Sequence, residues 1–250
     1  MNTNLPHIPA YATPAEILKA GVETAKGPVS LACSFSPEDI AIIDIAHAAG
    51  ITVGVFAIDT GRLNEETYEV AEALVERYRL KIDWYFPRHE DVERLEREKG
   101  LFSFRESLDN RHECCTIRKV EPLSRALKEL AGWVTGMRRQ QGITRNDLQA
   151  IERDELNGGL LKINPLIEWD EERVRAYSTE RNLPVNRLFR EGYRSIGCAP
   201  CTRAVKPGED ERSGRWWWEN PEHKECGLHV HSDQATPARK AITGIGNLQL

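Results

Sequence analysis

Short apolar runs alternate with helix-period segments over the first two thirds of the chain. The apolar runs are continuous and rich in β-branched residues, which is typical of strands buried on both faces. They predict parallel strands over 28–35, 51–59, 81–86 and 132–137, and a further strand over 160–169. The segments between them predict helices over 36–50, 64–78, 117–132 and 170–182. Ser36 and Pro37 suit the N-cap and first position of the first of these helices.

Strands that alternate with helices predict an α/β fold, with an open, mostly parallel sheet and helices on both faces. From Lys206 onward the periodicity stops, and the sequence becomes rich in proline, glycine and charge. We therefore expect one α/β domain over 1–205 and a flexible C-terminal tail over 206–250 that folds over another part of the molecule.

Composition narrows the class of protein. The 250 residues carry a net charge of −5, which provides no whole-chain attraction for nucleic acid or for an anionic membrane. No apolar run approaches a membrane span, and the first 20 residues lack the features of a signal peptide. A cytoplasmic location is expected, where paired cysteines are more often metal ligands or redox catalysts than disulfides.

Four of the six cysteines form two pairs. Cys114 and Cys115 are adjacent, and Cys198 and Cys201 form a C-x-x-C motif. Four thiolates bind either structural zinc or an iron–sulfur cluster. Because neighbouring helical residues point about 100° apart, an adjacent pair reaches two irons of a cubane more easily than two corners of one zinc tetrahedron. The spacing favours iron–sulfur, while zinc and plain buried thiols remain alternatives.

The other two cysteines differ in their surroundings. Cys33 lies within the first predicted strand and is expected in the core, whereas Cys226 lies in the polar tail between Lys224 and His229. Nearby positive charge favours a thiolate, so Cys226 is a candidate nucleophile. The same tail carries Arg212, Arg215 and the consecutive tryptophans 216–218, which suit either core anchoring or ligand contact.

Polar loops follow the first two predicted strands. The sequences SFSPED (34–39) and DTGR (59–62) end these strands, and Arg138, Arg139 and Arg145 follow the fourth. Because the carboxyl ends of parallel strands share one edge of the sheet, these loops predict an anion site there. Arg118 and Lys119 come directly after the cysteine pair and place cations beside any metal group.

Together the motifs SFSPED, DTGR, ECCTIRK, TGMRRQQGITR, GCAPCTRAVKPGEDERSGRWWWE and KECGLH, in this order, resemble the assimilatory adenylyl-sulfate reductase family. These are relatives of phosphoadenylyl-sulfate reductase with the adenine-nucleotide alpha-hydrolase (PP-loop ATPase-like) fold. The resemblance covers most of the chain. It implies reduction of adenosine 5′-phosphosulfate (APS) to sulfite and AMP in assimilatory sulfate reduction and cysteine biosynthesis, with a thioredoxin- or glutaredoxin-like dithiol as electron donor.

The resemblance also implies a role for each matching residue. A [4Fe–4S] cluster would be bound by Cys114, Cys115, Cys198 and Cys201, and Cys226 would attack the substrate sulfur to form an S-sulfocysteine. Lys119 would couple the cluster to the substrate. The phosphosulfate would be held by Arg145, Arg212 and Arg215, and the nucleotide site would be lined by Ser34, Phe35, Ser36 and Thr60.

Two alternatives remain at this stage. A 3′-phosphoadenylyl-sulfate (PAPS) reductase, or an enzyme that uses both substrates, shares the fold, although PAPS-specific relatives generally lack the two cysteine pairs. A zinc-binding module with four structural thiolates belongs to a different class and predicts no role for Cys226. The sequence leaves the oligomeric state open, a homo-oligomer included.

Overall fold

A six-stranded sheet forms the centre of the protein. The computed structural model describes residues 5–141 and 147–220. The strands are β1 (Val29–Cys33), β2 (Gly54–Ile58), β3 (Ile82–Tyr85), β4 (Gly132–Val134), β5 (Ile151–Asp154) and β6 (Leu160–Ile163). Their order is β3-β2-β1-β4-β6-β5, and every neighbouring pair is parallel except the antiparallel β5 and β6.

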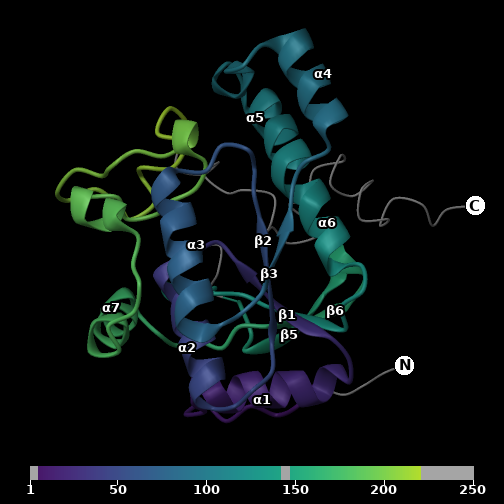
Figure 1. The fold of residues 1–250 in the computed structure, drawn as a ribbon, viewed down its shortest axis with the longest axis vertical. Helices are drawn as coiled ribbons and strands as arrows, with labels where there is room; N and C mark the ends of the chain where they lie inside the picture. Colours follow the sequence, from purple (N-terminus) through teal and green to yellow (C-terminus); the bar gives the residue numbers. More distant parts are fainter. Residues whose placement is uncertain (1–4, 142–146, 221–250) are drawn as a thin grey trace, which may run out of the picture.

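Helices cover both faces of this sheet (Figure 1). The α-helices are α1 (Pro14–Ala25), α2 (Pro37–Ala48), α3 (Glu65–Tyr78), α4 (His89–Lys99), α5 (Leu108–Cys115), α6 (Glu121–Leu127) and α7 (Glu171–Glu180). The main apolar cluster joins the sheet to α1, α2, α3 and α7, and a second cluster packs α6 against the opposite face around Phe56 and Trp133. The predicted fold class is therefore confirmed.

The local sequence explains where the helix before the site begins. The Ser36 hydroxyl accepts the Asp39 N–H as the N-cap of α2, and Pro37 occupies the first turn, as the sequence predicts. Three parallel strands emerge beside this helix in the order β2-β1-β4. From β1 the chain adds β2 and β3 on one side of the sheet. It then returns to add β4 and β6 on the other side of β1. The strand order therefore reverses between β1 and β4, which is a topological switch point.

The predicted elements are present with shorter bounds, and four further α-helices and strands of the described residues were not predicted. The predicted strand over 160–169 ends at Ile163, because the next residues form turns. The unpredicted elements are α1, α4, α5 and β5. Helix α4 buries only Leu95, so its apolar pattern is weak. Strand β5 lies at the sheet edge, where one side of the strand has no partner strand.

A buried carboxylate ties three helices together. Asp44 on α2 is 2% exposed and accepts hydrogen bonds from the Tyr78 hydroxyl of α3 at 2.9 Å and the Tyr177 hydroxyl of α7 at 2.7 Å. The Arg181 Nε, just after α7, donates to Asp44 at 2.9 Å. Burial by itself raises the pKa of Asp44, but the hydrogen bonds from Arg181 and the two tyrosines outweigh it and lower the pKa.

We expect Asp44→Ala to lower the free energy of unfolding by about 3 kcal/mol, because two tyrosine hydroxyls then lose their buried acceptor. Urea unfolding at neutral pH measures this change. Asp83→Ala is the matched control, since it removes a carboxylate from the exposed ion pair with Lys81, and we expect a change below about 0.5 kcal/mol. Equal losses in the two variants would contradict the structural role of Asp44.

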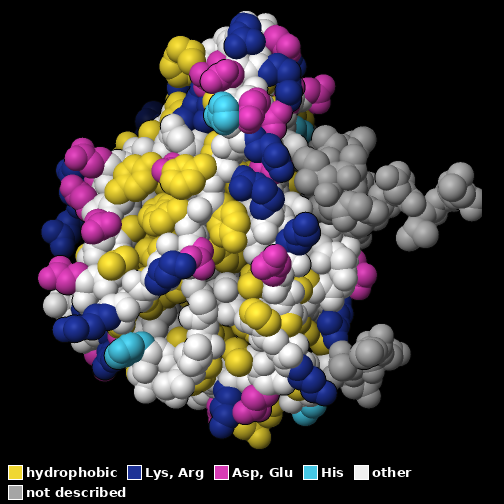
Figure 2. All heavy atoms as spheres, turned by 45° about the vertical axis from the view of Figure 1, so that its right-hand side comes forward, with side chains coloured by type: hydrophobic (Ala, Val, Ile, Leu, Met, Phe, Trp, Pro, Cys, Tyr) yellow, Lys and Arg dark blue, Asp and Glu magenta, His cyan; other side chains and the backbone are white. Residues whose placement is uncertain are grey.

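No helix in the described part of the chain is long and apolar enough to span a membrane. Figure 2 shows basic and acidic side chains interspersed over one face, with hydrophobic side chains gathered to the left of its centre. This face therefore carries both acidic and basic side chains and no basic patch, in a chain whose net charge is negative.

Candidate active site

The switch point opens into a cavity of about 750 Å³. The cavity is lined by loops that follow three parallel strands: Ser34 and Phe35 after β1, Thr60 after β2, and Gly136 after β4. Arg212 and Arg215 from the C-terminal part of the described chain line it as well. The predicted edge of the sheet therefore carries a pocket of the size that small ligands occupy.

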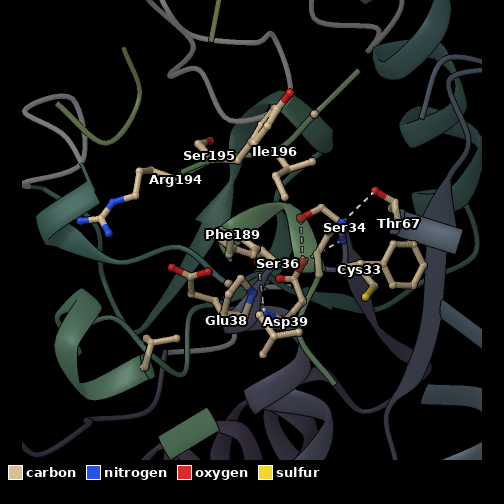
Figure 3. Close-up of a pocket in the computed structure, with 18 of the residues that line it drawn as sticks. Cys33, Ser34, Ser36, Glu38, Asp39, Thr67, Phe189, Arg194, Ser195 and Ile196 are labelled. Atoms are coloured by element: carbon tan, nitrogen blue, oxygen red, sulfur yellow. Dashed lines mark hydrogen bonds between the residues drawn. The ribbon is translucent and has the colours of Figure 1, made fainter. Parts of the chain in front are cut away.

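The loop after β1 is held by its own hydrogen bonds. The Asp39 Oδ2 accepts the Ser34 N–H at 2.7 Å and the Ser34 hydroxyl at 2.8 Å. Figure 3 shows Ser34, Ser36 and Asp39 close together on one wall of the pocket. Phe35 has a φ of 63°, is 4% exposed, and stacks on Trp84 with ring centroids 5.6 Å apart. The polar groups of Ser34 and Ser36 thus support the loop, in addition to facing the pocket.

Asp39 is buried, and this burial is the main reason why its pKa rises to about 6 from an ordinary value of 3.8. Above pH 6 the Asp39 carboxylate is therefore ionised in both states, but it is buried in the folded protein and surrounded by water in the unfolded chain. Between pH 5 and 7.5 the folded state gives up this proton, while the unfolded state is already ionised. This group thus makes the free energy of unfolding fall as the pH rises.

We expect the stability of the wild-type chain, relative to Asp39→Asn, to fall by about 1.4 kcal/mol between pH 5 and pH 7.5. The asparagine keeps an acceptor for Ser34 but does not titrate. Anaerobic urea unfolding of both proteins at the two pH values measures the difference. A wild-type stability that tracks Asp39→Asn at both pH values would contradict the raised pKa.

The loop after β4 approaches the start of α2 closely. A Cβ added at Gly136 would lie 2.5 Å from Asp39 Oδ1, so only glycine permits this approach. Next to it, Arg138 is 1% exposed, and its Nε donates to Glu38 at 2.8 Å. Arg138 lines the pocket as the sequence predicts, whereas Arg139 bonds Glu168 and a backbone carbonyl and does not line it.

The two cysteine pairs meet beside the pocket. Helix α5 ends with Cys114 and Cys115 and continues as a π-helical turn over Thr116–Val120, and Cys198 directly precedes a 3₁₀ turn over Ala199–Cys201. One small cavity lies between these segments. It is lined by Arg62, Phe104, Arg111, Cys114, Cys115, Arg118, Lys119, Cys198, Cys201 and Trp216. The four predicted ligands are therefore brought together.

The π-helical turn carries two cations into this region. Arg118 and Lys119 are 5% and 9% exposed and line the cysteine cavity. Arg118 donates to the Thr60 carbonyl at 2.7 Å and to Glu96, while its buried Nε has no hydrogen-bond partner among the described residues. Such widened turns often occur at functional sites. An unsatisfied buried N–H on a residue that lines the thiol cavity suits an anionic group there.

The thiols have different electrostatic surroundings. Burial opposes ionisation of Cys198, but Lys119, the Thr60 hydroxyl at 3.3 Å, Arg215 and Arg118 outweigh it and lower the pKa of this thiol. Burial raises the pKa of Cys114, and burial together with Cys198 raises that of Cys201 to about 12. Of these three thiols, Cys198 is therefore the one that the cations favour as a thiolate.

The donor set fits a multinuclear metal group. In residues 5–141 and 147–220, no three His, Cys, Asp or Glu side chains are grouped closely enough for a single metal ion. The four cysteines instead surround a common cavity together with four cations, Arg62, Arg111, Arg118 and Lys119. Four thiolates around one cavity are a ligand set that an iron–sulfur cluster uses, and the cations would balance their charge.

The segment after the C-x-x-C motif packs back onto the cysteines. Thr202 and Arg215 form an isolated antiparallel bridge, and the Trp216 N–H donates to the Cys201 carbonyl at 3.1 Å. Trp216 is buried, Trp217 is 38% exposed, and Trp218 packs on Phe104, so the three tryptophans do face different sides. The predicted residues Arg145 and Cys226 lie outside the described residues, and the predicted boundary at 206 stays a prediction.

The sequence did not predict one ion pair of this site. Arg111 on α5 is completely buried and pairs with the part-buried Glu219 at 2.9 Å. Both are long charged residues in segments rich in charge, so the sequence contains no signal for the burial of Arg111 or for its partner. Cys33, by contrast, is buried in the core as predicted.

Comparison with known proteins agrees with this site. Residues 28–204 match the phosphoadenosine phosphosulfate reductase domain. An adenosine 5′-phosphosulfate reductase from Burkholderia cepacia is 43% identical over 233 residues, which cover 93% of each chain. Among solved structures, phosphoadenylyl-sulfate reductase from Candida auris, in a phosphate complex, has a TM-score of 0.66 at 31% identity and covers 78% of this chain and 91% of its own.

A more distant structure supports the fold alone. FMN adenylyltransferase from Candida glabrata has a TM-score of 0.55 at 14% identity, over 92% of this chain and 84% of its own. The match to the reductase domain, by contrast, spans β1 through the second cysteine pair and so includes most residues that line the two cavities, with Glu211, Arg212, Arg215 and Trp216 beyond it. The chain therefore belongs to the phosphoadenosine phosphosulfate reductase domain family, together with relatives named adenosine 5′-phosphosulfate reductases.

Proposed function

We propose that this chain is an adenylyl-sulfate reductase that converts APS to sulfite and AMP in sulfate assimilation. One observation supports this most strongly: Lys119 and Cys198 line both the large pocket and the cysteine cavity. An anionic substrate in the pocket and a thiolate-bound group in the cavity would thus share the same cation. The names of the curated relatives point to the same substrate.

We propose a [4Fe–4S] cluster as the resident group, held by Cys114, Cys115, Cys198 and Cys201. When bound, this cluster supplies negative charge and polarisation next to Lys119, and it carries no electrons in the proposed reaction. Arg118 and Lys119 balance the thiolates, and the Thr60 hydroxyl, 3.3 Å from the Cys198 sulfur, orients that ligand.

The pocket residues have separate roles in the proposed reaction. Lys119 and Arg215, which both lower the pKa of Cys198, concentrate positive charge at the cysteine end of the pocket. We assign the phosphosulfate to this end, where Arg212 and Arg145 add further positive charge. The nucleoside then occupies the part lined by Phe35 and Ser36, with Ser34 supporting the loop, and Thr60 lines the nucleotide site where it meets the cysteine end.

The chemistry uses a thiolate from the tail. Cys226 attacks the sulfur of APS, a sulfur–sulfur bond forms, and the sulfur–oxygen bond to the phosphate breaks with its electron pair leaving on AMP. One thiolate of the dithiol donor then attacks the Cys226 sulfur, sulfite leaves with the electron pair, and the second donor thiol resolves the mixed disulfide. The donor dithiol is oxidised by two electrons, and Cys226 is restored as a thiolate.

Several parts of this proposal go beyond the family assignment. The donor is proposed to be a thioredoxin- or glutaredoxin-like protein in the cytoplasm, and the tail over 206–250 is proposed to deliver Cys226 to the pocket. On the face that Figure 2 shows, acidic and basic side chains are interspersed. This face lacks the basic patch that is typical of nucleic-acid binding, which agrees with a small-molecule substrate.

Anaerobic turnover with APS and a reduced dithiol protein tests the function. The proposal predicts sulfite and AMP in equal amounts, and without the dithiol it predicts no sulfite and no more than one AMP per chain. PAPS is assayed in parallel, because its extra phosphate separates an APS-selective enzyme from one that uses both substrates. Turnover of PAPS without turnover of APS would contradict the proposed substrate.

A further inference from the structure

Arg111 is the most deeply buried charge next to the cysteines. It is 0% exposed, and its Nε and Nη2 donate to the two carboxylate oxygens of Glu219 at 3.0 and 2.9 Å. Burial by itself lowers the pKa of Arg111, but the hydrogen bonds to Glu219 and the neighbouring Cys115 outweigh it and raise the pKa. This two-point ion pair, the Arg111–Glu219 clamp, joins α5 to the last described turn of the chain.

The clamp encloses a strained tryptophan. Trp216 has a φ of 41°, which is uncommon for a bulky residue, and it is 1% exposed. Arg111 lies 4.8 Å from the centroid of its ring, and Arg215 lies 4.6 Å from it. Two guanidinium groups on one indole repel each other unless a carboxylate compensates, and Glu219 provides that charge.

The contacts around Trp216 also position its neighbour Arg215. A Cβ at Gly197 would lie 2.3 Å from Arg215 Nη2, so the guanidinium packs directly against the backbone before Cys198. The segment of residues 214–216 is held by the Arg203 N–H, which donates to the Gly214 carbonyl at 3.0 Å, and by the Trp216 bond to Cys201. A shift of Trp216 therefore moves Arg215 relative to the substrate pocket.

We infer that Arg111 and Glu219 are positioning residues: their ion pair aligns Arg215 through Trp216. The inference rests on the proposed function for its kinetic consequences, but not for its structural ones. Neither residue is among the described residues that line the large pocket. Their effect on Arg215 is transmitted by Trp216.

Glu219→Gln in the full-length, cluster-loaded chain tests this inference. The glutamine keeps the size of the side chain but removes the charge that balances Arg111 and Arg215. We expect trypsin to cleave after Arg215 about tenfold faster, as measured by the mass of the 1–215 fragment under native conditions. Glu113→Gln is the matched control, because Glu113 lies on the same helix as Arg111 and its carboxylate forms an exposed ion pair with Lys99. The cleavage rate of this variant should equal that of wild type.

Kinetics separate positioning from a general loss of stability. We expect the KM for APS to rise about tenfold and the single-turnover rate of Cys226 modification to fall about tenfold, with iron per chain unchanged. A merely structural role lowers the amount of active protein but leaves KM unchanged. Glu219→Asp, which keeps the charge, should recover part of both losses.

The outcomes are distinguishable. Cleavage of Glu219→Gln at the control rate, an unchanged KM, or loss of iron in this variant would each overturn the inference. A wild-type chain that does not reduce APS would contradict the proposed function instead, and faster cleavage after Arg215 in Glu219→Gln would still support the clamp.

Discussion

Replacing Cys226 by serine is expected to lower the rate of sulfite production by at least about 10⁴-fold, because serine is not ionised near neutral pH and does not form the S-sulfocysteine. The four proposed cluster ligands are untouched in this variant. The protein should therefore keep its brown colour, its iron content and its affinity for AMP. Anaerobic sulfite assays measure the rate, and an absorption spectrum of the same sample measures the colour.

Cys33→Ala is the matched control for this variant. Cys33 is a buried core thiol on β1 that lines the large pocket, so its loss removes a cysteine near the substrate but not the proposed nucleophile. We expect it to retain turnover within a few-fold of wild type. Full activity in Cys226→Ser would place the nucleophile elsewhere in the chain.

The second large effect is expected for Cys115→Ala, which removes one of the adjacent cysteines that line the common cavity. Iron should fall from about four per chain to below about one, because a thiolate-bound cluster seldom survives the loss of a ligand. Iron and acid-labile sulfide analysis after anaerobic purification measure this loss. Removing the ligand also takes negative charge away from Arg111, which keeps its ion pair with Glu219, so thermal stability should fall as well.

Two results would contradict this account of the cysteines. Unchanged iron in Cys115→Ala would exclude it as a ligand. A colourless wild-type protein with one zinc per chain would support the structural zinc alternative, although the described side chains contain no compact group for one ion. Cys33→Ala should again match wild type, since Cys33 does not line the cysteine cavity.

Much of the fold was predictable because of how parallel strands are buried. Strands β1, β2 and β4 lie inside the sheet, so their sequences are continuous apolar runs. Edge strand β5 carries the sequence IERD, in which the apolar signal is lost. Helix α1 was missed although Thr13 and Glu16 form a capping box, a signal that the sequence does contain.

Some residues of the site were likewise predictable from the sequence, and others were not. The cysteine pairs and Lys119 were predictable because their spacing and order along the chain carry the information. The π-helical turn that buries Arg118 and Lys119 depends on packing against Thr60 and Glu96, which are distant in sequence. The Arg111–Glu219 pair joins residues 108 positions apart, and such tertiary pairs have no local pattern. Long-range burial of charge is thus what the sequence alone does not reveal.

The most direct test of the central claim is the mass of the enzyme after a single encounter with substrate. The full chain, purified without oxygen, is mixed with APS in the absence of any thiol, digested and analysed by mass spectrometry. The account predicts one added SO₃ group per chain, on the peptide that contains Cys226, and its release as sulfite when a reduced dithiol protein is added. An unmodified Cys226 peptide together with AMP release, or an SO₃ group on another residue, would contradict it.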